Sequence, residues 1–141
     1  MTNAELLDTL YAYWRGKNVQ GILALFTDDC VYIDMAMRAT FHGKDKLRDF
    51  IEDVYRSVPD FSVVYRNRFA GDKFGAGEWT ISGTRQGQYE GVDVSGVPVR
   101  FEGLSFYEFR DGKISRNTDC WDPTVVMEQL GVLDLRLKRL R

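Results

Sequence analysis

The chain has 141 residues, 44% of them hydrophobic, which is enough for one globular domain that buries a core with a pocket beside it. Its net charge of −2 gives no electrostatic reason to expect a nucleic-acid partner. No leader pattern opens the sequence, and no apolar stretch approaches the roughly 18 residues that a membrane span requires. We therefore expect a soluble, cytoplasmic protein that binds neither nucleic acid nor membrane.

The N-terminal half combines helix patterns with one short strand. Residues 2–5 read Thr-Asn-Ala-Glu, a capping box, and apolar residues follow at helical spacing through residue 14. Asn18 can cap a second helix, whose apolar positions extend to Phe26. The segment 30–34 is β-branched and aromatic, which predicts a strand, and helical spacing returns over 47–54.

The C-terminal half is dominated by strand patterns. Turn signals separate four segments rich in β-branched and aromatic residues, at 61–69, 73–83, 98–109 and 113–121. Asp122 and Pro123 then have the identities of a helix cap and a first helical residue, and Gly131 can end that short helix. Helices first and strands afterward predict an α+β fold, with helices packed on one face of a strongly curved, mostly antiparallel sheet.

We assign residues 1–132 to this single domain and residues 133–141 to a basic tail in which leucines alternate with arginine and lysine. The tail is either an extension that packs in a dimer or a frayed end. In the strand 98–109, Leu104 and Phe106 point away from the face that the helices cover. Such apolar residues need a partner, so we expect a homodimer.

Cys30 and Cys120 are the two cysteines of the chain, and both lie in apolar-rich segments. Two thiols are too few for a disulfide scaffold, so we expect reduced residues in the core. The single histidine, His42, has no histidine partner, and no cluster of His, Cys and Asp has the spacing of a metal site. We expect neither a metal nor another cofactor.

Several stretches resemble those of a known superfamily. The segment TDDCVYID at 27–34, followed by FHGK at 41–44, is similar to the part of ketosteroid isomerase that contains its catalytic aspartate. GLSFYEFRDGKI at 103–114 and DCWD at 119–122 are similar to the SnoaL-like polyketide cyclases, as are EWT at 78–80, GT at 83–84 and QLG at 129–131. The resemblance covers about residues 4–132. It implies the NTF2-like fold, a cone around one small-molecule pocket.

The resemblance also assigns roles to individual residues. It places Asp34 at the position of the catalytic base and Ser105 where ketosteroid isomerase has a protonated aspartic acid. The helix position that supplies a phenol in that enzyme falls nearest Thr9, which leaves Tyr13, one turn later, as the candidate phenol. The acid/base aspartate of the cyclase branch aligns with either Asp119 or Asp122.

Strand alternation puts several candidate pocket residues on common faces: Tyr32 with Asp34, Trp79 with Ile81, Ser105 with Tyr107, and Asp119 with Trp121. In the family, these faces line the cone. A carboxylate among aromatic rings loses solvation, which raises its pKa and suits it to proton transfer beside a carbonyl. Two inward carboxylates would also repel each other, so that one serves as acid and the other as base.

Each of these residues also has a structural interpretation. Asp34 can cap a loop or pair with Arg38, and Asp119 can bond to a neighbouring strand or to Arg116. The aromatic residues can be plain core. Arg85 stands where the cyclases commonly have histidine, and it is either a solvated loop cation or a lid over the pocket mouth.

The expected function is that of a SnoaL-like or isomerase-like enzyme with catalytic Asp34, Asp119 and Tyr13. Such an enzyme forms an enolate from a hydrophobic, carbonyl-bearing small molecule and then cyclises or isomerises it. The substrate would contact Tyr32, Trp79, Ser105, Tyr107 and Trp121. The alternatives are a non-catalytic binding or dimerisation module, and an epoxide hydrolase-like enzyme that uses Asp119. In the latter, Trp79 and Ile81 stand where the hydrolase has arginine and aspartate.

Overall fold

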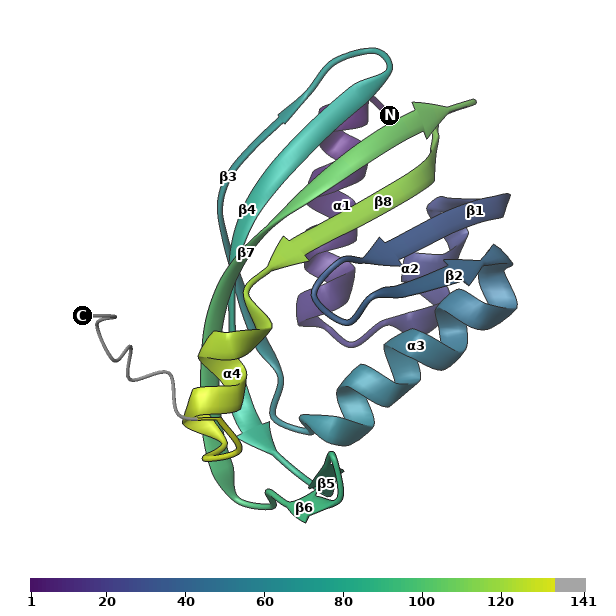
Figure 1. The fold of residues 1–141 in the computed structure, drawn as a ribbon. Helices are drawn as coiled ribbons and strands as arrows, with labels where there is room; N and C mark the ends of the chain where they lie inside the picture. The colour runs from purple at the N-terminus through teal and green to yellow at the C-terminus, as the bar shows by residue number, and fades with distance from the viewer. Residues whose placement is uncertain (134–141) are drawn as a thin grey trace, which may run out of the picture.

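The computed structural model describes residues 1–133, which form a curved sheet with helices against its concave face (Figure 1). The helices are α1 (Asn3–Arg15), α2 (Val19–Ala24), α3 (Gly43–Ser57) and α4 (Pro123–Gln129). The strands are β1 (Phe26–Asp34), β2 (Ala39–His42), β3 (Ser62–Ala70), β4 (Phe74–Arg85), β5 (Gln88–Tyr89), β6 (Val92–Asp93), β7 (Val97–Arg110) and β8 (Lys113–Trp121). Residues 134–141 of the expected tail lie outside the described residues.

Six strands form the main sheet in the order β2-β1-β8-β7-β4-β3, while β5 and β6 form a separate hairpin. The strands β1 and β8 pair in parallel, and the other neighbours pair antiparallel. The α+β architecture with a curved, mostly antiparallel sheet is therefore confirmed. Each of the four predicted C-terminal strands is present to within two residues at either end.

Local signals explain where the helices begin. The Thr2 hydroxyl accepts a hydrogen bond from the Glu5 amide at 3.1 Å, and the Glu5 carboxylate accepts one from the Thr2 amide at 2.8 Å. The predicted capping box is thus formed. The Asn18 side chain likewise accepts from the Gly21 amide at the start of α2. That helix ends at Ala24, earlier than predicted, because Phe26 already belongs to β1.

The core lies between α1, α2, α3 and the concave side of the sheet. The helix α1 contributes a buried stripe at helical spacing, made of Leu6, Leu7, Leu10, Tyr11 and Trp14. The helix α3 adds Leu47, Phe50 and Ile51. No helix in residues 1–133 is long and apolar enough to cross a membrane.

The expectation of two core cysteines is half wrong. Cys30 is buried, whereas Cys120 is exposed. Cys120 pairs with Leu104 on the convex face of the sheet, where Leu104 is 55% exposed. An apolar-rich strand sequence does not indicate which face is covered, and the alternation of β8 turns Asp119 and Trp121 inward instead.

Candidate active site

A cavity of about 510 Å³ lies between the concave face of the sheet and α3, with α4 and β5 at its rim. Its walls include all the strand residues that alternation predicted to face inward: Tyr32, Asp34, Trp79, Ile81, Ser105, Tyr107, Asp119 and Trp121. The volume is within the range of small-molecule sites. The structure therefore brings the predicted strand residues together, and it places Tyr13 elsewhere.

Tyr13 lies outside the cavity, so the prediction that it supplies the pocket phenol is wrong. Its half-buried ring lies beside Gly21, at the corner between α1 and α2. A helix turns about 100° per residue, so a position two residues after Tyr11 points away from the inward stripe. The phenol that α1 turns inward is Tyr11, which is buried and stacks on Tyr65.

Asp34 and Asp119 are register partners on the parallel strands β1 and β8, and both line the cavity. The two residues are 3% and 8% exposed. The strand order forces this proximity, because the ends of β1 and β8 lie side by side although 85 positions separate the residues in sequence. Two carboxylates therefore converge on one apolar cavity.

Asp119 is held by three donors. The Ser105 hydroxyl donates to Asp119 Oδ1 at 2.6 Å, the Asn117 amide donates to the same oxygen at 2.8 Å, and the Tyr32 hydroxyl donates to Oδ2. The Trp79 indole N–H donates to Ser105 Oγ at 2.8 Å. This bond leaves the single Ser105 proton directed at Asp119, so the carboxylate has a fixed orientation.

The electrostatics of Asp119 suit proton transfer. Burial raises its pKa to about 6, while the hydrogen bonds from Ser105, Tyr32 and Asn117 oppose the rise and the nearby charge of Asp34 adds to it. A carboxyl with this pKa is mostly ionised at pH 7, yet it binds a proton far more readily than an exposed aspartate.

Asp34 has a different set of donors. The Trp121 indole N–H lies 3.1 Å from both carboxylate oxygens, and the Met37 amide donates to Oδ1 at 3.0 Å. Burial raises the pKa of Asp34, and these hydrogen bonds oppose the rise. Asp34 therefore lines the cavity and also caps the turn that follows β1, so both of these predictions from the sequence apply to it.

The choice between Asp119 and Asp122 is settled by position. The Asp122 side chain accepts a hydrogen bond from the Thr124 amide at 2.9 Å and so caps α4, as its place before Pro123 predicted. It is exposed and lies outside the cavity lining. Asp119 is the aspartate that faces the cavity.

Gly103 shapes the cavity wall without lining it. It lies on β7 between Trp79 of β4 and Trp121 of β8 in the sheet register. A Cβ at this position would stand 2.5 Å from Cζ2 of Trp79 and 2.8 Å from the carbonyl oxygen of Cys120. The absence of a side chain at residue 103 therefore gives the Trp79 indole its space.

Sequence reasoning missed several lining residues. Asn117 precedes Asp119 by two positions on β8, so alternation alone would have placed it on the inward face. Phe41, Phe50 and Phe101 complete an aromatic wall. Phe41 belongs to the FHGK stretch of the resemblance, which gave it no role in the pocket, and no motif included Phe50. Within residues 1–133, no group of three or more His, Cys, Asp or Glu side chains is placed to hold a metal ion.

Comparisons with known proteins agree with this architecture. The protein YesE of Bacillus subtilis (strain 168) is 27% identical over 133 residues, which cover 90% of this chain and 86% of that protein. A candidate SnoaL-like polyketide cyclase from Jannaschia sp. CCS1 superposes with a TM-score of 0.82 at 18% identity, over 94% of this chain and 93% of that one. A candidate polyketide cyclase from Pseudomonas putida KT2440 has a TM-score of 0.76 at 25% identity, over 92% of this chain and 98% of that one.

The family described as SnoaL-like polyketide cyclase matches residues 4–130, which is nearly the whole described domain. This match and the neighbouring structures agree with the sequence resemblance and with the ketosteroid isomerase-like fold. The chain belongs to the SnoaL-like polyketide cyclase family.

Proposed function

We propose that the protein is an enzyme that forms an enolate from a hydrophobic, carbonyl-bearing small molecule, with Asp119 as the proton-transfer group. The observation that supports this most directly is a buried carboxyl with a pKa of about 6 in the wall of an apolar cavity. A general base is most effective when its pKa lies near the working pH. The family of this chain is consistent with chemistry of the cyclase or isomerase type.

In the proposed step, the ionised Asp119 takes a proton from the carbon beside the substrate carbonyl. The C–H bond breaks, an O–H bond forms on Asp119, and the electron pair moves onto the carbonyl oxygen to give the enolate. Tyr107 lines the same cavity, and burial keeps its pKa well above the ordinary value for tyrosine. Its hydroxyl therefore stays protonated and can donate a hydrogen bond to the developing oxyanion.

The enolate has two productive fates. In an intramolecular aldol closure its carbon attacks a second carbonyl of the same molecule, a C–C bond forms, and the new alkoxide takes the proton back from Asp119. In an isomerisation the proton returns to a different carbon. Both outcomes conserve protons and electrons within the substrate and Asp119, so the same residues serve either reaction.

Asp34 has a supporting role in this proposal. The family resemblance places the base at Asp34, but Asp119 has a pKa of about 6, which burial raises most and the charge of Asp34 raises further. We assign Asp34 as the ionised neighbour that keeps the proton affinity of Asp119 high. If Asp34 were the base instead, its substitution would abolish proton abstraction and that of Asp119 would not.

Hydrogen–deuterium exchange tests the enolate step without the native substrate. We expect the protein to accelerate exchange of the protons beside the carbonyl of 2-tetralone in D₂O, followed by ¹H NMR at pD 7.5. Asp119→Asn should reduce the protein-dependent rate about a hundredfold, the lower end of typical base contributions. Asp72→Asn, which alters an exposed loop aspartate outside the cavity, is the matched control.

The result also distinguishes the other functional classes. A binding module would bind the ketone and leave its protons unexchanged. An epoxide hydrolase-like enzyme would instead hydrolyse a probe such as styrene oxide in an Asp119-dependent manner. The cavity is continuous, with Trp79 and Trp121 in its wall, and this geometry supports an enzyme over a module filled by its own side chains.

A further inference from the structure

Arg85 is the cation of the cavity lining. It is the last residue of β4, and its half-buried side chain lies at the rim near Tyr89, which belongs to the β5–β6 hairpin. The other charged residues of the described lining are the aspartates 34, 53 and 119. Asp53 forms an ion pair with Arg56 along α3, so its charge is already matched.

The guanidinium of Arg85 is held in place by backbone groups. One terminal nitrogen donates to the Gln86 carbonyl, and the other donates to the Gln88 carbonyl at 3.1 Å. The backbone here is also anchored, because the Gln86 amide donates to the Ser57 carbonyl at 2.7 Å and the Gly96 amide donates to the Arg85 carbonyl at 2.9 Å. A guanidinium has five N–H groups, so several remain for a ligand.

Arg85 lacks a counter-ion within the described chain. None of the ion pairs found in residues 1–133 includes it. The neighbouring lining is apolar, with Val99 and Phe101 on β7. A partly desolvated guanidinium in such surroundings gains from an anionic partner, and a planar carboxylate matches its geometry.

The two charged ends of the cavity are well separated. Asp119 aligns with Gly77 of β4 through Ser105, and Arg85 lies eight positions farther along β4. Eight residues of extended strand span roughly 26 Å, which the curvature of the sheet and the length of the arginine side chain shorten. An anion at Arg85 is therefore beyond strong repulsion from Asp119 at physiological salt.

We propose that Arg85 forms an anion subsite, and that the ligand of this cavity is an elongated, largely apolar molecule with a carboxylate or similar anionic group at one end. The anion binds Arg85 at the mouth, the apolar body lies along the aromatic wall, and the opposite end reaches Asp119. The inference rests on the proposed function only in that both use this cavity.

Fluorescence titration with a matched pair of probes tests the subsite. The probes are 1-pyrenebutyrate, which is anionic at pH 7.5, and 1-pyrenebutanol, which has the same apolar body without the charge. We expect the wild-type protein to bind the butyrate about tenfold more tightly, with a preference that shrinks as salt rises. Arg85→Gln should lose this preference and keep its affinity for the alcohol within about twofold, whereas Arg85→Lys should retain part of the preference.

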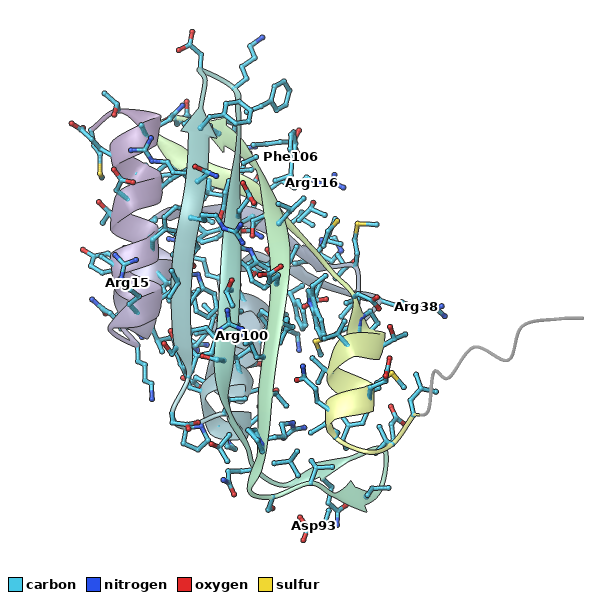
Figure 2. The ribbon with its side chains drawn as sticks, turned by 90° about the vertical axis from the view of Figure 1, so that its left-hand side faces the viewer. Arg15, Arg38, Asp93, Arg100, Phe106 and Arg116 are labelled. Carbon is cyan, nitrogen blue, oxygen red and sulfur yellow. The ribbon has the colours of Figure 1, made fainter. Side chains whose placement is uncertain are left out.

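The control is Arg100→Gln on β7. Arg100 is exposed and, as Figure 2 shows, lies on the outer face of the sheet, away from the cavity. The Arg100→Gln variant should prefer the butyrate over the alcohol to the same extent as the wild type. Equal affinity of the wild type for both probes would overturn the proposal, as would failure of both to bind or a loss of both affinities in a folded Arg85→Gln. A preserved charge preference without tetralone exchange would refute the enolate chemistry and leave the anion subsite standing.

Discussion

Asp34 and Asp119 face the same cavity from register-paired positions on two parallel strands, and burial, with a smaller contribution from the charge of Asp34, raises the pKa of Asp119. The relationship places two like charges in an environment that solvates neither of them well. One carboxyl therefore ionises at a lower pH than the other, and the second retains a high proton affinity. Here Asp119 is the group with the pKa of about 6.

Asp34→Asn should lower the pKa of Asp119, because the substitution removes a nearby like charge and keeps the shape of the side chain. Titration of the Asp119 carboxyl carbon by ¹³C NMR measures this directly. If the protein exchanges ketone protons, the acidic limb of its pH–rate profile should move to lower pH by the same amount. An Asp119 pKa that stays near 6 or rises would show that the charge of Asp34 does not raise it.

Asp119→Asn should be as stable as the parent or more stable at pH 7. The pKa is about 6 in the folded protein and about 3.9 in an unfolded chain, so ionisation costs the native state on the order of 3 kcal/mol at neutral pH. The parent regains that stability as the pH falls from 6 to below 4. The variant, which does not titrate there, should lose its advantage over the same range.

Hydrogen-bond geometry allows this exchange of side chains. Asparagine Oδ1 can accept from Ser105 and Asn117 as the aspartate does, and its amide can donate to the Tyr32 hydroxyl, which is able to act as an acceptor. Urea unfolding at pH 7 and pH 4 provides the comparison. A variant clearly less stable than the parent at pH 7 would make Asp119 a structural acceptor.

Ser105→Ala should raise the pKa of Asp119 above about 6, because the serine hydroxyl stabilises the ionised form. It should also reduce the free energy of unfolding by about 1–3 kcal/mol, since the Trp79 indole N–H then loses its partner in a buried site. NMR titration and urea unfolding measure the two effects. Ser62→Ala, at an exposed position of β3, should change neither.

The convex face of the sheet should form a homodimer. Phe106, labelled in Figure 2, is 46% exposed there and stacks on Phe74. The same strands of the sheet also expose Val64 and Phe69 on β3 and Leu104 on β7. Burying such residues against a second copy is favourable. Sedimentation velocity should show a dimer at micromolar concentration and a monomer for Phe106→Glu. A wild-type monomer at high micromolar concentration would contradict the prediction.

The sequence predicted the strand side of the cavity well and the helix side poorly. Strand alternation has a period of two residues, so Asp34, Trp79 and Asp119 could be assigned to faces from local pattern alone. The helical assignment of Tyr13 failed because an error of one or two residues rotates a side chain through 100° or more. The prediction for Cys120 depended on which face of the sheet the helices cover. That depends on how the whole sheet packs and cannot be read from the sequence of one strand.

The chemistry of the cavity was harder to predict than its lining. The pKa of Asp119 depends on donors from β1, β7 and β8 together with the charge of Asp34, and only the register of the sheet brings these groups into contact. The proposed role of Arg85 likewise depends on the β5–β6 hairpin that follows β4, where the sequence indicated only a turn between two strands.

The position of the Trp79 ring in the cavity wall depends on the absence of a side chain at Gly103. Because the Trp79 indole occupies the space above residue 103, even a methyl group there would push the ring toward the cavity or out of its bond with Ser105. The shape of the cavity wall and the hydrogen bonds that set the proton affinity of Asp119 are thus linked through one backbone position. A substitution that alters this wall would therefore also change the pKa of Asp119.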